Sequence, residues 1–456
     1  MEQPAPFPGW RIDNRIDGDP ALPSLAEIEV LVVGGGAAGV AAATVAAEKG
    51  KSVILVERYG FCGGAAVAGM SGTICGLYLA SETRNRPAQV VFGFAERFRS
   101  ALAKRGGLTK PQIYGKTFTV THDPLMWRET ADRLLEDAGV RVLFHTAVTG
   151  VLMDGQVLRG VIVESNAGRS VIRAKRIIDA SGDAAVVARA GYRYTFGDKG
   201  KIQNPTMFFR LGNVDLDAFG VYWGADTICP PKVVEAIEAA DHSGAYRLPR
   251  NKIWIFPTTR PNELMVNATR LSGRDGRMLN VIDPADFTEA EIFGRQQVRE
   301  YARFLTDMIP GCADSFVVDT GVEAGIRQTR SIVGKATLRN EDVVDCRKRD
   351  DGICRVPWPI ELHSGDKPKL HWLLDDYYEV PYGALVPEIG ENIIVAGRCL
   401  SAEHEALASA RVTAQCFEYG HAAATAAVMS IDQVTPFSDL RGEDVREAMT
   451  HQGSAL

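Results

Sequence analysis

The stretch VLVVGGGAAG at residues 30–39 decides the fold of this chain. It begins inside an apolar, β-branched run, IEVLVV at residues 28–33, of the kind that is buried on both faces of a parallel sheet. The run ends at Gly34, and Gly34, Gly36 and Gly39 are spaced as G-x-G-x-x-G. This order predicts a buried strand that enters a tight, glycine-rich turn.

The residues after this turn complete a strand–helix–strand unit. An Ala-rich segment at residues 40–49 predicts a helix, and a second apolar run at residues 52–56 ends at Glu57. A helix N-terminus suits a diphosphate, and an acid at the end of the second strand accepts hydrogen bonds from ribose hydroxyls. The unit therefore predicts dinucleotide binding, although a glycine-rich turn can also serve packing alone. The predicted cofactor contacts here are Gly34, Gly36, Ala37, Ala38, Gly39 and Glu57.

A second glycine-rich loop directly follows Glu57 and bears on which dinucleotide binds. Its small residues would let the backbone pass close to a large planar ligand, which a domain for NAD does not need. The loop residues predicted to line the cofactor are Arg58, Cys62, Gly63, Gly64 and Ala65. In this order of acid, basic residue and Gly-Gly turn, the chain resembles the glutathione-reductase-like flavoproteins with two dinucleotide domains, which implies FAD.

Two further segments strengthen that resemblance. An apolar run ends in ASGD at residues 180–183, similar to the A-T-G-D turn of the same flavoproteins, and another ends at Gly397 before an Ala-rich helix expected at residues 411–429. The N-terminus of that helix carries partial positive charge suited to the flavin pyrimidine ring. The resemblance implies cofactor contacts from Ala180, Gly182, Gly397, Arg398 and Val412, and an adenine contact from Val148.

Taken together, four stretches resemble the bacterial FAD-dependent oxidoreductases that are distantly related to fumarate reductase flavoproteins. They are VLVVGGGAAGVAAA at residues 30–43, GFCGGAAVAG at 60–69, IRQTRSIVGKATL at 326–338 and NIIVAGRCLSAEHEALASARV at 392–412. The resemblance covers most of residues 27–430, and the stretch AGRCLSAEHEALASARV at residues 396–412 is its most diagnostic part. Cys62 stands where the family more often has an aliphatic residue, and Ala408 where glycine is common. The resemblance implies the fold and the cofactor, but members act on varied substrates, so it does not imply the substrate.

The expected architecture is α/β, with a Rossmann-like FAD-binding domain, made of a parallel sheet and a β-meander, and an inserted α+β substrate domain. Aromatic residues, prolines and alternating patterns rise after residue 196 and predict an antiparallel sheet there. A helix at residues 288–308 is expected to be a solvated cap. The expected divisions are a lead-in at 1–26, the FAD-binding domain at 27–195 and 383–435, the substrate domain at 196–382 and a tail at 436–456.

Composition excludes several classes of protein. The 51 Lys and Arg against 57 Asp and Glu give a formal charge of -6, so we expect no nucleic-acid partner. Eight scattered cysteines without metal-ligand spacing predict reduced thiols, no metal site and a cytoplasmic protein. Residues 30–47 are the uncharged stretch that raises the question of a membrane span, but they hold four glycines and are better explained by the strand and helix.

His404 and Arg411 are the first candidates for catalysis. Imidazole titrates near neutrality, and His404 lies in the loop that leads to the helix expected beside the flavin, although the ring could instead hold that loop in place. Arg411, expected at the helix start, could bind a substrate carboxylate or stabilise anionic reduced flavin. Pairing of Arg411 with Glu403 or Glu405 is the structural alternative.

Further candidates are weaker. His363 and Tyr382 fall where the family motif also has them, and each either lines the substrate face or is structural. Glu323, Arg327 and Arg330 have the spacing of a salt-bridged helix, and an arginine of that helix could instead donate a proton to substrate, as in fumarate reductases. Cys62 raises a thioether to flavin or a redox thiol as a possibility, but packing beside the cofactor explains it as well.

The sequence predicts an FAD-dependent oxidoreductase that transfers a hydride to or from a small organic substrate. No second G-x-G-x-x-G follows a strand, so a dedicated NAD(P)H domain is not expected, and the electron acceptor or donor is left open, as is a homo-oligomer. One alternative is a flavin-bearing biosynthetic enzyme of the thiazole-synthase or RNA-modifying type. The other is a non-catalytic FAD-binding scaffold.

Overall fold

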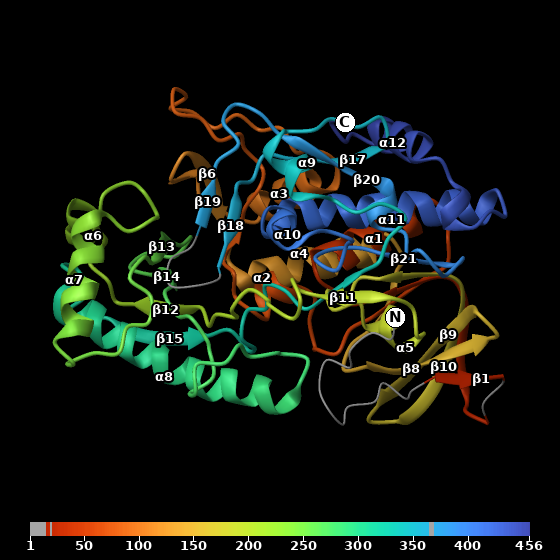
Figure 1. The fold of residues 1–456 in the computed structure, drawn as a ribbon, viewed down its shortest axis with the longest axis horizontal. Helices are drawn as coiled ribbons and strands as arrows, with labels where there is room; N and C mark the ends of the chain where they lie inside the picture. Colours follow the sequence, from red (N-terminus) through yellow and green to blue (C-terminus); the bar gives the residue numbers. More distant parts are fainter. Residues whose placement is uncertain (1–14, 19–20, 364–368) are drawn as a thin grey trace.

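A computed structural model describes residues 15–18, 21–363 and 369–456, which form two packed bodies side by side (Figure 1). The larger body is built on an eight-stranded sheet in the order β1-β8-β9-β10-β2-β3-β7, with β21 paired to β10. Its parallel strands are β2 (Ser24–Val33), β3 (Val53–Val56), β7 (Arg141–Leu143), β10 (Gly168–Asp179) and β21 (Ile393–Val395). This is the Rossmann-like sheet that the glycine pattern predicts.

The β-meander extends one edge of this sheet. β8 (Ala147–Asp154), β9 (Val157–Ser165) and β10 pair antiparallel in sequence, and β1 (Arg15–Asp17) pairs parallel with β8. The predicted lead-in at 1–26 thus contributes β1 and the start of β2, while residues 1–14, 19 and 20 of it lie outside the described residues.

Two Ala-rich helices cross close together on the sheet. α1 (Ala37–Glu48) is buried along most of its length, and α11 (Thr413–Asp432) packs directly against it. Gly420 allows the contact, since a Cβ there would lie 2.0 Å from the Ala38 carbonyl oxygen. Small side chains on both helices therefore bring a segment near residue 40 against one near residue 420. α3 (Gly93–Lys104) and α4 (Pro124–Asp137) extend this helical layer.

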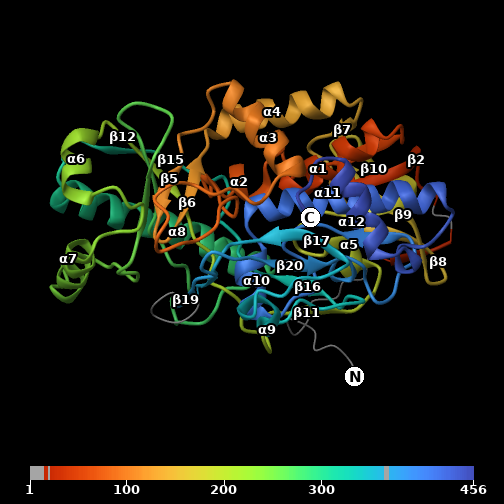
Figure 2. The same ribbon diagram turned by 90° about the horizontal axis from the view of Figure 1, so that it is seen from above.

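The smaller body has its own core. Its antiparallel sheet has the order β13-β14-β12-β15, from β12 (Phe209–Gly212), β13 (Trp254–Pro257), β14 (Leu264–Asn267) and β15 (Phe316–Thr320). Helices α6 (Leu216–Trp223) and α7 (Pro231–His242) lie at its far end, away from the eight-stranded sheet in both views (Figures 1 and 2). A separate cluster of buried apolar side chains, from residues 207–324, holds this body together.

The long helix of the smaller body differs from its prediction. α8 (Pro284–Met308) begins four residues earlier than expected, because the Asp283 carboxylate caps it by accepting from the backbone N–H groups of Ala285 and Asp286. It is not a fully solvated cap, since Tyr301 and Phe304 are fully buried in the core of that body. Its amphipathic pattern marks a helix that packs on one face.

Short strands connect the two bodies and shift the expected division between them. β11 (Tyr194–Phe196) pairs with β16 (Arg330–Ile332), β17 (Gly352–Val356) with β20 (Tyr378–Pro381), and β18 (Ile360–Leu362) with β19 (Lys369–His371). Buried side chains of β16, β17, β18 and β20 belong to the core of the larger body. Core packing therefore assigns residues 330–362 to the larger body, whereas the sequence pattern placed them in the substrate domain.

The remaining short elements are a three-stranded sheet and several short helices. β4 (Thr73–Ile74), β6 (Thr117–Thr121) and β5 (Gln112–Tyr114) form a three-stranded sheet. The short helices are α2 (Gly64–Val67), α5 (Ala185–Arg189), α9 (Asn340–Val344), α10 (His404–Ala410) and the 3-10 turns η1 (Tyr382–Ala384) and η2 (Phe437–Asp439).

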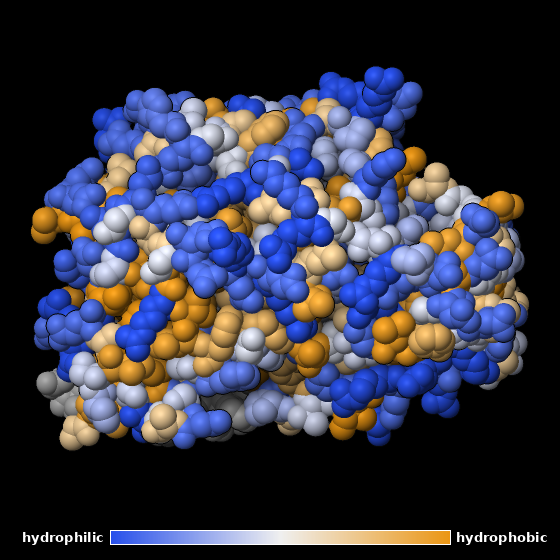
Figure 3. All heavy atoms as spheres, turned by 180° about the vertical axis from the view of Figure 1, so that it is seen from behind, coloured by the Kyte–Doolittle hydropathy of each residue, from blue (hydrophilic) through white to orange (hydrophobic). Residues whose placement is uncertain are grey.

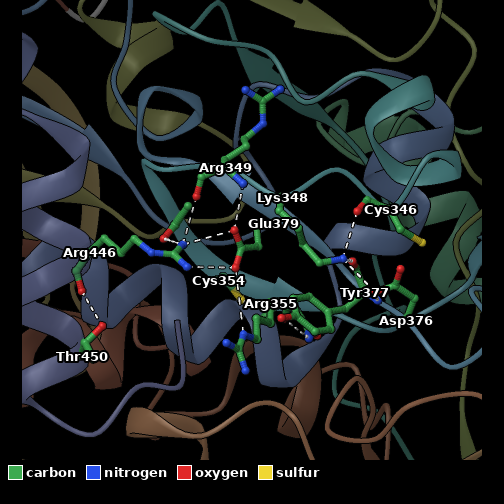
Figure 4. A network of polar contacts seen from close by, with 12 residues as sticks. Cys346, Lys348, Arg349, Cys354, Arg355, Asp376, Tyr377, Glu379, Arg446 and Thr450 are labelled. Carbon is green, nitrogen blue, oxygen red and sulfur yellow. Dashed lines mark hydrogen bonds and ion pairs between the residues drawn. The ribbon is translucent and has the colours of Figure 1, made fainter.

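Residues 436–456, which the sequence pattern set apart as a C-terminal tail, pack against the larger body. These residues contain α12 (Gly442–His451), whose Val445 and Met449 are buried in the main core. The Arg446 guanidinium donates to the carbonyl oxygen of Gly352 at 2.7 Å and to the buried Glu379 carboxylate (Figure 4). Apolar burial and a partly buried ion pair thus fix the helix to β17 and β20.

The surface mixes polar and apolar side chains. Hydrophilic residues cover most of the face seen in Figure 3, with apolar side chains between them. In the described part of the chain, no helix has both the length and the apolar character needed to cross a bilayer. All eight cysteines have free thiols.

Candidate active site

A cavity of about 600 Å³ lies where the two bodies meet. One end is formed by the glycine turns of the larger body, and the other by side chains from β18, from β13 and from the segments around residues 327 and 411. Most of the predicted cofactor contacts line it; the two that do not are Gly39 and Cys62. Those that do are Gly34, Gly36, Ala37, Ala38, Glu57, Arg58, Gly63, Gly64, Ala65, Val148, Ala180, Gly182, Gly397, Arg398 and Val412.

Each glycine of the first turn meets a different neighbour. Gly34 has φ +101°, and a Cβ there would lie 2.6 Å from the Ala180 carbonyl oxygen. A Cβ on Gly39 would lie 1.8 Å from the Gly34 carbonyl oxygen, so this glycine serves helix–strand packing behind the cavity wall. Gly36 caps the N-terminus of α1 without a side chain, and a Cβ there would meet nothing nearer than 3.9 Å. Gly36 therefore leaves space in front of a helix N-terminus, which suits a diphosphate.

The second glycine loop lies directly against the first. The Gly63 N–H donates to the Gly35 carbonyl at 2.8 Å, and a Cβ on Gly64 would lie 3.0 Å from the Gly36 Cα. Cys62 is fully buried, with its Sγ 2.7 Å from the position of a Cβ on Gly35, and burial raises the pKa of its thiol well above the usual value. This burial argues against a thioether or a redox thiol at Cys62 and favours packing under the turn.

Glu57 ends β3 at the cavity edge. Its Oε2 accepts from the Gly35 N–H at 2.6 Å and its Oε1 from the Tyr59 N–H at 3.0 Å, while burial raises its pKa. Each carboxylate oxygen has further lone-pair capacity for a hydroxyl donor. The position fits the ribose contact predicted for this acid.

A third segment closes the cofactor end. The fully buried Asp179 carboxylate accepts from the Ser181 N–H and hydroxyl and from the first N–H groups of α5, at Val186 and Val187. These bonds fix the turn that carries Gly182. The Arg398 guanidinium lies against Gly182 and donates to the Asp183 Oδ1 at 2.6 Å, which links the turn to the strand end at Gly397.

The opposite end of the cavity is polar. The Tyr114 hydroxyl donates to Glu361 Oε1 at 2.7 Å, and His363 Nε2 lies 3.3 Å from the same oxygen. Glu361 lies in β18 and His363 directly follows the strand, so strand alternation places both side chains on one side. Arg327, which is 7% exposed, and Arg411, which is partly exposed, line the cavity beside them.

Charges at this end are strongly coupled. Burial would raise the pKa of Glu361, but His363, the Tyr114 hydroxyl and Arg411 together lower it to about 2. Burial and the nearby Arg327 charge lower the pKa of His363 to about 3, against the opposing effect of Glu361. At neutral pH the carboxylate is therefore ionised and the imidazole uncharged.

Comparison with known proteins identifies the family. The model of the family described as FAD dependent oxidoreductase matches residues 29–449, which is most of the chain. The chain belongs to this family of FAD-dependent oxidoreductases. Its cofactor is FAD, and the space in front of Gly36, the free capacity of Glu57 and the turn at Gly182 fit that dinucleotide.

Curated relatives match a smaller part. Thiamine thiazole synthase from Aeropyrum pernix is 31% identical over 172 residues, which are 35% of this chain and 57% of that protein. The thiamine thiazole synthase from Methanococcus vannielii is 30% identical over 173 residues, 36% of this chain and 60% of that protein. The chain thus spans less than two thirds of the length of these relatives.

Solved structures resemble the whole chain at low identity. A geranylgeranyl bacteriochlorophyll reductase-like protein from Thermoplasma acidophilum has TM-score 0.48 and 14% identity, covering 94% of this chain and 84% of its own. The p-nitrophenol 4-monooxygenase from Pseudomonas putida has TM-score 0.47 and 11% identity, covering 94% and 88%.

The structure separates the four predicted catalytic residues of this flavoprotein. His363 and Arg411 line the cavity, whereas His404 and Tyr382 do not. His404 begins α10 outside the cavity wall, and the Tyr382 hydroxyl donates to the Phe437 carbonyl oxygen at 3.0 Å. Their positions argue against the catalytic roles predicted for them. Arg411 lies in the turn between α10 and α11, not at the start of one continuous helix.

The helix expected over Glu323, Arg327 and Arg330 is wrong. No helix covers residues 321–329, and Arg330 begins β16. The Glu323 carboxylate instead accepts from Arg58 and from the Tyr59 hydroxyl, and Arg327 donates to the Asn204 carbonyl oxygen at 2.7 Å. Arg58 and Glu323 thereby join the FAD side of the cavity to its opposite wall.

Sequence reasoning missed Tyr114 and Glu361. Tyr114 belongs to a short strand without a recognisable motif and reaches Glu361 across 247 positions of the chain. Glu361 did carry a signal, because it stands two residues before His363 and strand alternation places both on one face. Among residues 15–18, 21–363 and 369–456, no group of three or more His, Cys, Asp or Glu is placed to hold a metal.

Proposed function

We propose that the protein dehydrogenates a small organic substrate, with His363 as the general base. The observation that carries this proposal is the single cavity in which the FAD cradle at Gly36 and the Glu361–His363 pair face the same space. When bound, FAD supplies hydride acceptance. The substrate therefore loses a hydride from carbon and a proton from the adjacent hydroxyl or amine, and the protein must supply the group that takes the proton.

The geometry of His363 suits that task. Its Nε2 lies 3.3 Å from Glu361 Oε1, and this neighbouring carboxylate favours the tautomer with the proton on Nε2. Its Nδ1 makes no hydrogen bond with the described residues and is available to a substrate. A general base must be uncharged before it takes a proton, and with a pKa near 3 the ring meets that condition at neutral pH. Because so low a pKa also makes the ring a weak base, the proposal assigns stabilisation of the protonated ring to the Glu361 carboxylate, which raises that pKa.

Electrons must leave after each turnover. The cysteines that line the cavity, Cys75 and Cys416, are poor candidates for a thiol relay, since burial raises the pKa of each to about 12. The proposal therefore assigns the electrons to an external acceptor such as oxygen, a quinone or a soluble carrier.

A second candidate is a biosynthetic enzyme that uses the dinucleotide in another way. The similarity to thiamine thiazole synthases favours it, although it covers 35% of the chain. The two candidates differ in a direct way, because a dehydrogenase substrate reduces the bound flavin in the absence of oxygen.

The test is an anaerobic screen of alcohols, amines and hydroxy acids for loss of flavin absorbance in the purified holoprotein. With the compound that bleaches fastest, His363→Gln should slow flavin reduction by about 10²–10⁴-fold, the usual contribution of a general base. His451→Gln, on the exposed face of α12, is the control and should change the rate less than twofold. An unchanged rate in His363→Gln, or no bleaching compound at all, would sink the proposal.

A further inference from the structure

We propose that the substrate is a carboxylic acid with an apolar, ring-sized body, held by Arg327 and Arg411 against an aromatic wall. This inference deepens the proposed function and rests on it, because the bound acid is a substrate only if the protein is a dehydrogenase.

The polar end of the cavity holds more positive than negative charge. Arg327 and Arg411 line it, and Arg250, which is 4% exposed, lies close enough for its charge to act on Arg327. Glu361 is the carboxylate that acts most strongly on each of the three arginines among the described residues, and His363 is uncharged there. Three guanidiniums against one carboxylate leave a buried excess that an anionic ligand would neutralise.

The guanidinium groups of Arg327 and Arg411 also have hydrogen-bond donors that the protein does not use. Arg411 donates from Nη2 to Gln203 Oε1 at 3.0 Å, and its buried Nε has no partner in the described structure. Arg327 donates from Nη1 to the Asn204 carbonyl oxygen at 2.7 Å. Each arginine carries five N–H donors, so both retain donors for a carboxylate, whose two oxygens match the guanidinium fork.

Part of the wall of the same cavity is aromatic. Tyr114, Phe256 and Trp358 line the cavity and are almost fully buried. Their rings form a continuous surface, with centroids 5.0 Å apart for Tyr114 and Trp358 and 6.2 Å apart for Tyr114 and Phe256. Such a wall recognises a flat apolar group, so an acid with a ring-sized body matches both sides of the site.

The flavin itself is the rival recipient of these charges. Arg411 precedes Val412, the N-cap of α11, and both Val412 and Thr413 also line the cavity, so the Arg411 charge could act on reduced flavin. The two roles give different results in binding measurements. A substrate site binds a free carboxylate while the flavin stays oxidised, whereas a flavin-tuning arginine alters the redox potential alone.

The experiment measures binding of three probes to the oxidised holoprotein by calorimetry and by shifts of the flavin absorbance. Phenylacetate carries the acid and the ring, phenylacetamide replaces the charge with a neutral amide, and acetate lacks the ring. We expect phenylacetate to bind at least tenfold more tightly than either of the others. The measurement needs no turnover, so the site can be confirmed even where the dehydrogenase proposal fails.

Variants then test which residues recognise the carboxylate and which recognise the ring. Arg327→Gln and Arg411→Gln should each reduce the preference for phenylacetate over phenylacetamide at least tenfold, and Arg411→Lys should retain part of it. Phe256→Ala should reduce the preference for phenylacetate over acetate. Arg193→Gln, an exposed arginine paired with Glu388 outside the cavity, is the control and should change neither ratio.

Two results would overturn the inference. The first is equal binding of phenylacetate and phenylacetamide by the unaltered holoprotein. The second is an Arg411→Gln variant with a changed flavin midpoint potential and an unchanged dissociation constant for phenylacetate. If one glutamine variant fails to fold, the other arginine and the Arg411→Lys variant still report on the acid preference.

Discussion

The two ends of the cavity use different parts of the chain to prepare a site. At the FAD end, the contacts come from backbone at Gly34, Gly36 and Gly64, and a missing Cβ creates the space. At the other end, the surface is made by the side chains of Arg327, Arg411 and their neighbours. A backbone cradle suits a cofactor of constant shape, while a side-chain surface can change its ligand through single substitutions.

The largest effect should come from filling the backbone cradle. Gly36→Val meets no protein atom within 3.9 Å of its Cβ and has an ordinary φ, so the apoprotein should lose less than about 1 kcal/mol of stability. FAD affinity should fall more than 100-fold, about 3 kcal/mol, because the side chain occupies the approach to the helix N-terminus. Fluorescence titration of the apoprotein with FAD measures the dissociation constant.

Gly220→Val is the matched control for that cradle. Gly220 lies on the exposed face of α6 with nothing within 4 Å of its Cβ position. It should leave FAD affinity unchanged. Full FAD affinity in Gly36→Val would show that the two ends of the cavity do not differ in the way described.

A smaller effect should follow from loosening the support of the cradle. Asp179→Asn replaces two acceptor oxygens with one, so the N–H groups of Val186 and Val187 lose their buried partner. The apoprotein should lose about 2–3 kcal/mol of unfolding free energy in urea. Binding of phenylacetate to the FAD-saturated protein should stay within twofold, because Asp179 does not line the cavity. If the binding free energy of phenylacetate fell by more than the unfolding free energy of the apoprotein, the two ends of the cavity would not be supported separately.

The smallest effect concerns a buried histidine away from both ends. Both ring nitrogens of His122 lack partners in the described structure, and burial lowers its pKa to about 4. The unfolded chain binds the proton at about pH 6.5, so the unfolding free energy should fall by up to about 1.4 kcal/mol when the pH is lowered by one unit below 6.5. His122→Phe should remove this slope in urea titrations at several pH values. An unchanged slope would mean that burial alone does not keep a histidine neutral here, which would weaken the same argument for His363.

The two ends of the cavity also differ in how far they could be predicted from the sequence. The order of Gly34, Gly36, Gly39 and Glu57 predicts the β2–α1–β3 unit. A Cβ at Gly34 or Gly39 would clash with backbone, whereas Gly36 leaves space in front of the helix N-terminus. The FAD cofactor follows from that unit and its neighbouring loops. A contact made by the backbone depends on a few consecutive residues, so a cofactor contact of this kind can be predicted from one sequence.

The polar end was less predictable, because its residues are distant in sequence. Tyr114, Arg327 and Arg411 meet only after the two bodies pack, and no local spacing joins them. The spacing of Glu323 and Arg327 even suggested a helix, whereas Glu323 binds Arg58 across the cavity. The helix α12 was missed for a similar reason, since its anchors at Gly352 and Glu379 lie far from it in the chain.

The packing of α1 against α11 also determines when, during synthesis of the chain, the cavity can form. The cavity needs Gly36 and, nearly 380 residues later, the segment at Val412 and Thr413. A ribosome that adds about 5–20 residues per second takes on the order of 20–80 seconds to cover that distance. During this interval the first glycine turn is without its closing wall, so FAD loading belongs to a late stage of the protein's synthesis.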